Sequence, residues 1–206
     1  MSPATGPRVV HPIEAESYRI LRGLVDLSAL GPLSRAVAER VIHASADPAW
    51  ASDLVLDEHA LAGGLAALRA GTPVVVDARM VAAAITSRPT LCALDLAPPA
   101  ADSPPDHEEP VGTTRSAAGV RAAFDQVGTG AVWVVGCAPT ALDALLALPA
   151  SPALVVGLPV GLVGAVEAKR ALAASGLPAV TNRGAKGGSA VAAAALNALL
   201  YHREPA

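Results

Sequence analysis

The residue best suited to acid–base chemistry in this sequence is His43. It closes an apolar helical segment in which Glu39 and Arg40 share its face. An imidazole exchanges protons near neutral pH, so His43 is a candidate for proton transfer. A histidine in the last turn of a helix also interacts favourably with the helix dipole. The sequence pattern alone leaves both interpretations open.

The other titratable candidates carry weaker signals. Four histidines are predicted to be solvated: His11, His59, His107 and His202. Cys92 and Cys137 are far apart and no histidine–cysteine cluster accompanies them, so the sequence predicts no metal site. Asp77 and Arg79 follow a predicted strand and are candidates either for ligand contacts or for an internal pair.

Segments that combine glycine with hydroxyl or cationic residues follow several predicted strands. They begin at Asp77, Thr113, Gly136, Gly157 and Asn182. Ligands of parallel sheets bind at the carboxyl ends of the strands, and the free N–H groups of helix N-termini favour anions there. The sequence therefore predicts an anion-binding edge.

The distribution of charge along the sequence also concerns the predicted anion-binding edge. The chain has a net charge of −3, yet residues 168–203 contain no acidic residue. The basic residues of that stretch are Lys169, Arg170, Arg183, Lys186 and Arg203. A solvated face with helix-capping charges and a cationic binding region are both compatible with this pattern. The three glycines in the run from Arg183 to Ser189 favour close approach of a carboxylate or phosphate.

Standard nucleotide and hydrolase motifs do not match. Gly187 follows Lys186 where a phosphate-binding loop needs serine or threonine, and Pro159 occupies the first glycine position of a dinucleotide fingerprint. The sequence also lacks the Gly-x-Ser-x-Gly elbow of many hydrolases.

The elements that position these residues alternate between short apolar runs and helical patterns. Continuous apolar runs begin near Pro73, Leu91, Ala131, Ala153 and Pro178, and they predict strands buried on both faces. Helices are predicted over 12–30, 33–44, 57–70, 80–87, 116–127, 140–148, 165–174 and 188–202. This order predicts a single α/β domain over 11–206, with a mostly parallel central sheet, helices on both faces and an N-terminal helical segment.

Composition limits the class of protein further. The 206 residues are 52% hydrophobic and only 2% aromatic, so alanine, valine and leucine must build the core. No strongly apolar run is long enough to predict a membrane span or a signal peptide, and the negative charge opposes nucleic-acid binding.

Residues 1–10 are predicted to be a flexible tail. The proline- and acid-rich segment 97–110 is predicted to be a mobile loop, either a lid or a spacer.

Several ordered segments together resemble the precorrin-8X methylmutase family, which includes cobalt-precorrin-8 methylmutases. The resemblance covers about residues 11–200. Its segments begin at Glu16 (Glu-Ser-Tyr-Arg-Ile-Leu), Met80 (Met-Val-Ala-Ala-Ala-Ile-Thr), Thr113 (Thr-Thr-Arg-Ser-Ala), Gly136 (Gly-Cys-Ala-Pro-Thr), Pro159 (Pro-Val-Gly-Leu-Val-Gly) and Arg183 (Arg-Gly-Ala-Lys-Gly-Gly-Ser).

The resemblance implies an isomerase of cobalamin biosynthesis that moves a methyl group from C11 to C12 of a corrinoid without a cofactor. His43 matches the family's catalytic histidine. The matched segments imply substrate contacts at Ser17, Arg22, Thr86, Thr114, Arg115, Ser116, Arg183, Lys186, Gly187, Gly188 and Ser189. A cytoplasmic homodimer with sites near its interface is also implied. The alternatives are a cobalt-containing substrate and a non-catalytic corrinoid-binding protein.

The sequence departs from the family pattern at a few of these positions. Cys137 stands where asparagine is common, Ala84 where glycine is common, Leu162 where phenylalanine is common and Ala185 where a basic residue is common. The change at Ala185 removes one possible carboxylate contact, and Cys137 removes an amide. None of them affects His43.

Overall fold

A mixed six-stranded sheet forms the centre of the molecule. The computed structural model describes residues 11–98 and 114–203, so the tail 1–10 and nearly all of the segment 97–110 lie outside the described residues. The strands follow the order β1-β6-β5-β4-β2-β3, in which β1 is antiparallel to β6 and the other pairs are parallel. Their bounds are β1 Leu54–Val55, β2 Val74–Val76, β3 Leu91–Cys92, β4 Val132–Val135, β5 Leu154–Gly157 and β6 Ala179–Asn182.

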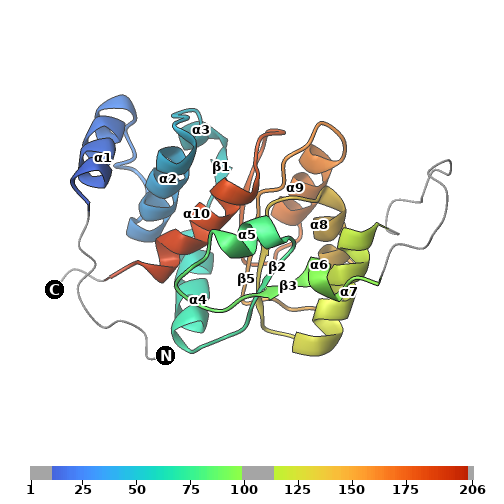
Figure 1. Cartoon of the computed structure of the whole chain (residues 1–206). Helices are drawn as coiled ribbons and strands as arrows, with labels where there is room; N and C mark the ends of the chain where they lie inside the picture. The colour runs from blue at the N-terminus through green and yellow to red at the C-terminus, as the bar shows by residue number, and fades with distance from the viewer. Residues whose placement is uncertain (1–10, 99–113, 204–206) are drawn as a thin grey trace.

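Helices cover both faces of this sheet (Figure 1). One layer contains α2 (Pro32–Ser45), α4 (Glu58–Arg69), α5 (Arg79–Ala83) and α10 (Ser189–Leu200), and the other contains α6 (Ala93–Leu96), α7 (Arg115–Val127), α8 (Pro139–Leu146) and α9 (Ala165–Ala174). The remaining helices are α1 (Pro12–Leu24), which packs on α2, and the short α3 (Trp50–Asp53).

Alternation along the strands assigns side chains to the two layers. Val132 and Val134 pack toward α2, α4 and α10, whereas Trp133 and Val135 pack toward α7 and α8. All four are buried, which agrees with the prediction of strands covered on both faces.

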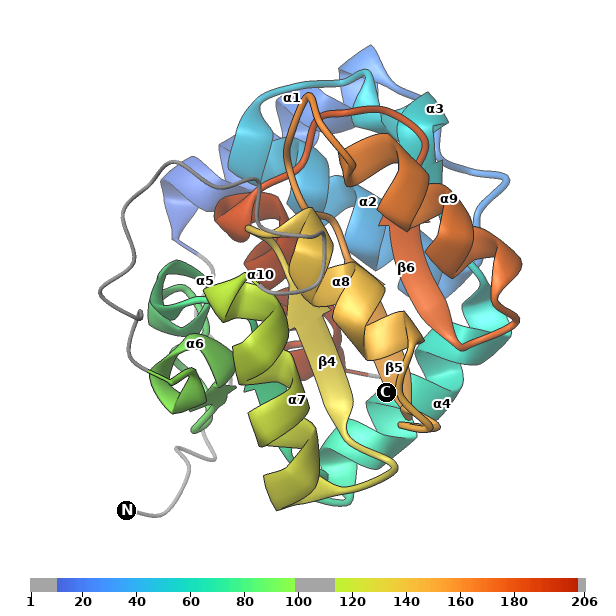
Figure 2. The ribbon, with the colours of Figure 1, turned by 90° about the vertical axis from the view of Figure 1, so that its right-hand side faces the viewer.

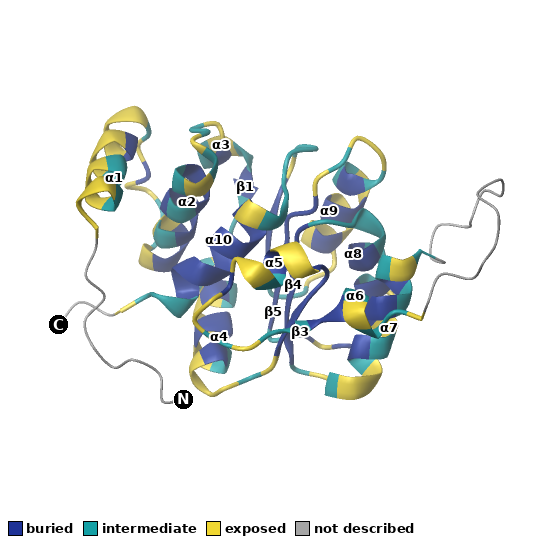
Figure 3. Cartoon of the chain, in the orientation of Figure 1, coloured by how far each residue is buried: buried dark blue, intermediate teal, exposed yellow. Residues whose placement is uncertain are grey.

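Helix α10 passes through the centre of its layer because its surface is almost entirely alanine and leucine. Its residues 191–199 are all buried, as the dark blue of this helix in Figure 3 shows. Small side chains let it lie against α2 and the sheet together. Asn197 donates a 2.8 Å hydrogen bond from Nδ2 to the Ala84 carbonyl and so holds the end of α5.

Most predicted elements are present, but several differ in their ends or were missed. The predicted first helix is wrong at its end: α1 stops at Leu24, and Asp26 accepts a 2.9 Å hydrogen bond from the Ser28 N–H in the turn that follows. The predicted helix 80–87 is also too long, because α5 ends at Ala83. The predictions did not include α3, α6 or β1. Among the described residues, no helix is long and apolar enough to cross a membrane.

Candidate functional site

His43 is held by two neighbours from α1. It lies half-buried in the last turn of α2, and its Nδ1 is 2.8 Å from the Ser17 hydroxyl oxygen. The Tyr18 ring stacks on the imidazole, with centroids 5.1 Å apart and an interplanar angle of 12°. The hydroxyl and the ring together fix the plane of the imidazole. This leaves Nε2 as the ring nitrogen that can exchange a proton with a ligand.

Arg22 joins α1 to α2 beside this histidine. Its Nε and Nη2 donate to the two carboxylate oxygens of Glu39 at 2.7 and 2.9 Å. These hydrogen bonds raise the pKa of Arg22. Glu39 is buried and Arg22 is largely exposed, so a paired guanidinium faces solvent next to Tyr18.

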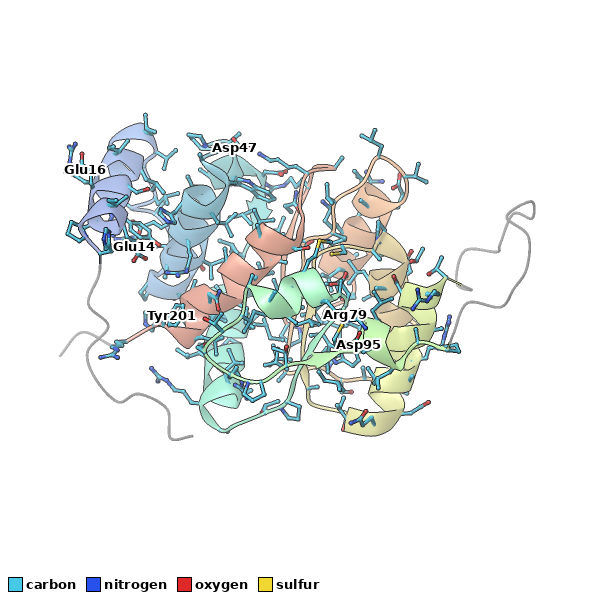
Figure 4. The ribbon with its side chains drawn as sticks, viewed as in Figure 1. Glu14, Glu16, Asp47, Arg79, Asp95 and Tyr201 are labelled. Carbon is cyan, nitrogen blue, oxygen red and sulfur yellow. The ribbon has the colours of Figure 1, made fainter. Side chains whose placement is uncertain are left out.

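A cavity of about 510 Å³ opens between α1, α2 and the end of α10. Its wall includes Arg22, Arg40 and Tyr18, the residue whose ring stacks on His43. Arg40 lies over the Tyr201 ring at 4.9 Å and is 3.5 Å from the Glu14 carboxylate. Figure 4 shows Glu14 on α1 and Tyr201 beyond the end of α10.

At the carboxyl edge of the sheet, a buried carboxylate joins two strand ends. Asp77 follows β2 and accepts hydrogen bonds from the backbone N–H groups of Gly136, Cys137 and Ala138 at 3.0, 2.7 and 3.0 Å. Burial raises the pKa of Asp77, and these hydrogen bonds oppose that shift. The Cys137 thiol is in turn 2.9 Å from the Ser189 hydroxyl, at the start of α10. Asp77 therefore holds the segments that follow β2 and β4 together at this edge of the sheet.

Arg79 has a different partner from the one that sequence spacing allowed. It forms a 2.6 Å ion pair with Asp95, which joins α5 to α6 (Figure 4). Asp77 and Arg79 therefore bind different partners and do not form an ion pair with each other.

The N-terminus of α7 carries a second group of candidates. Thr114 caps this helix by accepting a hydrogen bond from the Ala117 N–H, and its hydroxyl is 2.8 Å from that of Thr140 on α8. Arg115 is exposed and Ser116 is half-buried beside it. Thr86, beyond the end of α5, is also exposed.

The acid-free C-terminal stretch is not an unpaired cationic surface. Lys186 forms a 2.8 Å ion pair with Asp47 and lies 4.7 Å from the centre of the Trp50 ring. Arg183 donates from Nη1 to the Ser52 carbonyl at 2.6 Å. Asp47, from the N-terminal half of the chain, thus neutralises one cation of this stretch. Lys169, also in this stretch, is buried, so it is not part of the solvated face that was one of the two interpretations of this stretch.

Comparison with known proteins identifies the family. Residues 12–202 match the family model described as precorrin-8X methylmutase. The chain belongs to the precorrin-8X methylmutase family. This confirms the resemblance inferred from the motifs, and with it the prediction of an isomerase of cobalamin biosynthesis that moves a methyl group.

Named relatives of this precorrin-8X methylmutase family include enzymes of both substrate types. The precorrin-8X methylmutase of Pseudomonas aeruginosa is 40% identical over 204 residues, covering 93% of this chain and 95% of the relative. The cobalt-precorrin-8 methylmutase of Salmonella typhimurium is 38% identical, with coverages of 92% and 94%. That of Methanothermobacter thermautotrophicus is 37% identical and covers 91% of each chain.

A solved structure of the family confirms the predicted fold class. The crystal structure of precorrin-8X methyl mutase from Thermus thermophilus superposes with a TM-score of 0.78 at 36% identity. The match covers 92% of this chain and 96% of that one. The mostly parallel α/β sheet is therefore the fold of this methylmutase family.

The single chain does not bring all the candidate residues of this family together. Ser17, Arg22 and His43 lie on α1 and α2, whereas Thr114, Arg115 and Ser116 lie at the start of α7. Figures 1 and 2 show α1 and α7 at opposite ends of the fold, with α2, α10 and the sheet between them. The run 183–188 adjoins the α2 side, because Lys186 contacts Asp47 just beyond α2.

Some neighbours of the candidate residues were not predicted from the sequence. The stacking partner Tyr18 is the residue after Ser17, and it lies within the matched segment. Glu39 had been placed on the face of His43, but its contact with Arg22 joins two helices and has no signal in sequence spacing. Among the described residues, no group of three histidine, cysteine or acidic side chains could hold a metal ion.

Proposed function

We propose that this chain moves a methyl group from C11 to C12 of precorrin-8X, giving hydrogenobyrinic acid. The observation that carries the proposal is the fixed imidazole of His43, held by Ser17 and Tyr18 in a chain of this family. In this rearrangement the C11–methyl bond breaks as the C12–methyl bond forms within one molecule. It needs no oxidant, no reductant and no cofactor.

The proposed role of His43 is to protonate or hydrogen-bond the macrocycle through Nε2. A hydrogen bond at one edge polarises the π-system and stabilises charge that develops as the methyl group migrates. Ser17 and Tyr18 support this role because they restrict the ring to one orientation. A rearrangement within one molecule gains mainly from such a fixed geometry.

The proposed substrate contacts are the residues matched by the family motifs, from Ser17 to Ser189. The substrate is a polycarboxylate, which suits the cations and backbone N–H groups near these positions. Arg22, Arg183 and Lys186 already have partners, Glu39, the Ser52 carbonyl and Asp47. In this proposal they bind carboxylates with geometry set by those partners.

We also propose that the protein is a cytoplasmic homodimer whose partner copy completes the site. Two observations support a second copy: candidate residues lie at opposite ends of one chain, and apolar side chains are exposed near both groups. Ile13, Ile20 and Leu24 on α1 are 74%, 50% and 64% exposed. Leu162 and Val163, beyond the carboxyl end of β5, are 98% and 88% exposed. Exposed apolar surface of this kind favours association.

The test compares wild type with His43→Ala on precorrin-8X. We expect His43→Ala to fold and bind the corrinoid but to lose about 100-fold or more in turnover, since acid–base catalysis contributes at least that much. His59→Ala is the matched control, because His59 is exposed on α4, and it should retain full turnover. Full turnover by His43→Ala would contradict the mechanism.

The cobalt-containing alternative is tested in the same assay. Relatives that act on either substrate type are about equally similar, at 40%, 38% and 37% identity, so identity does not separate them. Comparing kcat/KM on precorrin-8X and on cobalt-precorrin-8 decides between the two substrates. Binding of both without conversion of either supports the corrinoid-binding alternative.

A further inference from the structure

A buried ammonium group lies beneath the glycine-rich run 183–188. Lys169, on α9, is 0% exposed, and its Nζ donates to Asn182 Oδ1 at 3.0 Å, to the Lys186 carbonyl at 2.8 Å and to the Gly184 carbonyl. Three N–H bonds thus meet three neutral acceptors. Within 11–98 and 114–203, no carboxylate forms an ion pair with this lysine.

A buried ammonium without an ion pair is a costly group for a protein to keep. An apolar side chain of similar length would fill the same volume more cheaply. The carbonyl groups that Lys169 binds therefore point to its role. It draws two peptide oxygens of one short run toward the interior.

The geometry of the peptide bond gives the consequence. In a trans peptide the C=O and N–H bonds point in opposite directions, and the described backbone has no cis peptide. When the Gly184 and Lys186 oxygens point toward Lys169, the N–H groups of Ala185 and Gly187 point away from it. Neither N–H forms a hydrogen bond with any residue that the structure describes.

Neighbouring groups hold the same peptides in place. Asn182 Nδ2 donates to the Gly184 and Lys186 carbonyls at 3.2 and 3.0 Å, and to Asp53 at 2.8 Å. Asp53 accepts the Gly184 N–H at 2.9 Å. Every polar backbone group of Gly184 is therefore bound inward, and the N–H groups of Ala185 and Gly187 remain free to bind a ligand.

We propose that Lys169 is a positioning residue that directs the backbone N–H groups of Ala185 and Gly187 toward a carboxylate of the substrate. Two outward N–H groups above a buried positive charge form a site for an anion. The inference rests on the proposed function, which supplies the polycarboxylate. Ala185 has no charged side chain, so its N–H group and the buried Lys169 supply the attraction for an anion at this position.

The protonation state of Lys169 makes the inference testable by pH. Burial lowers the pKa of Lys169 to about 8, and the Asp53 carboxylate opposes that shift. The charged groups that flank this run are Asp53, Arg183 and Lys186, and Glu167 and Arg170 lie on the same helix as Lys169. Above about pH 8 the amine becomes neutral, so it loses its positive charge and keeps only two N–H donors for its three acceptors.

The experiment measures the Kd of hydrogenobyrinic acid and the kinetics on precorrin-8X between about pH 7 and about pH 9.5. For wild type we expect Kd and KM to rise roughly tenfold over this range. Lys169→Met removes the charge at similar length, and we expect it to show the high Kd at every pH. Arg170→Met is the matched control, because Arg170 is an exposed cation on the same helix, and it should behave as wild type.

The outcomes separate the inference from the proposed function. A folded Lys169→Met variant with the Kd and pH profile of wild type overturns the inference alone. If that variant does not fold, a wild-type Kd that stays constant across the pH range overturns it. A wild type that binds no corrinoid overturns both the inference and the proposed function.

Discussion

His43 illustrates how two contacts can turn an ordinary helix-terminal histidine into a defined acid–base group. Its position in the last turn of α2 places it near the negative end of the helix dipole. The Ser17 hydroxyl then fixes Nδ1 and the Tyr18 ring fixes the plane. The dipole and the proposed catalytic role are compatible in this structure, although the sequence presented them as alternatives.

Ser17→Ala tests whether orientation of the ring matters. The variant keeps the imidazole and the Tyr18 stack but removes the hydrogen bond to Nδ1. We expect kcat on precorrin-8X to fall roughly tenfold with folding intact, because the proton donor is no longer held in one geometry. Ser175→Ala, an exposed hydroxyl at the end of α9, is the control. A Ser17→Ala enzyme with wild-type kcat is the result that speaks against this role.

At the scale of elements, the run 183–188 is fixed by close packing as well as by hydrogen bonds. A Cβ atom at Gly187 would lie 2.3 Å from the Leu158 carbonyl oxygen and 2.6 Å from that of Pro159. Only glycine lets these two strand-end segments approach so closely. Gly187 is therefore needed for packing, in addition to any contact with a ligand.

Gly187→Ala is expected to displace this run. We predict a loss of about 2 kcal/mol or more in the free energy of unfolding, measured by urea denaturation, because the neighbouring backbone must move. Gly63→Ala is the contrasting variant: it lies inside α4 with nothing within 4 Å of its new Cβ, and should stabilise by about 0.5–1 kcal/mol. Equal stability changes in the two variants would contradict the packing argument.

The sequence predicted the larger elements because their patterns are local. Continuous apolar runs marked the strands on which Trp133 and Val155 lie, and helix α9 begins and ends where its periodicity predicted. Strand β1 has only two residues, and its pairing with Thr181 and Asn182 depends on contact across the chain. No local pattern could have indicated it.

The ion pairs of the candidate site also could not be predicted from local sequence patterns. The acid-free stretch was correctly identified in the sequence, but Asp47 and Asp53 lie far from it along the chain. Only the fold brings these acids to Lys186 and Gly184. For the same reason the burial of Lys169 could not be read from its helical spacing, which fits a solvated face equally well.

At the scale of the whole molecule, the two groups of candidate residues are the main feature to explain. His43 lies on the α1–α2 side and Arg115 at the start of α7, at opposite ends of the fold (Figures 1 and 2). A twofold dimer whose interface includes both ends of the chain places unlike ends together in two equivalent places. In the proposed homodimer, each site then takes residues from both copies.

Mixing two inactive variants tests this arrangement. His43→Ala and Arg115→Ala chains, refolded together in equal amounts, should recover about a quarter of wild-type activity, because half the dimers are mixed and each has one intact site. Each variant alone should remain nearly inactive. No recovery, with mixed dimers present, would place His43 and Arg115 in the same chain's site.

The measurement that tests the central claim most directly follows the methyl group itself. Wild-type protein is incubated with precorrin-8X that carries a carbon-13 label in the methyl group at C11, and the product is analysed by NMR and by its absorption spectrum. We predict that the label appears on C12, that the spectrum becomes that of hydrogenobyrinic acid, and that His43→Ala leaves the label in place. A label that stays at C11 with the wild-type protein, on precorrin-8X and on its cobalt form alike, would contradict the account.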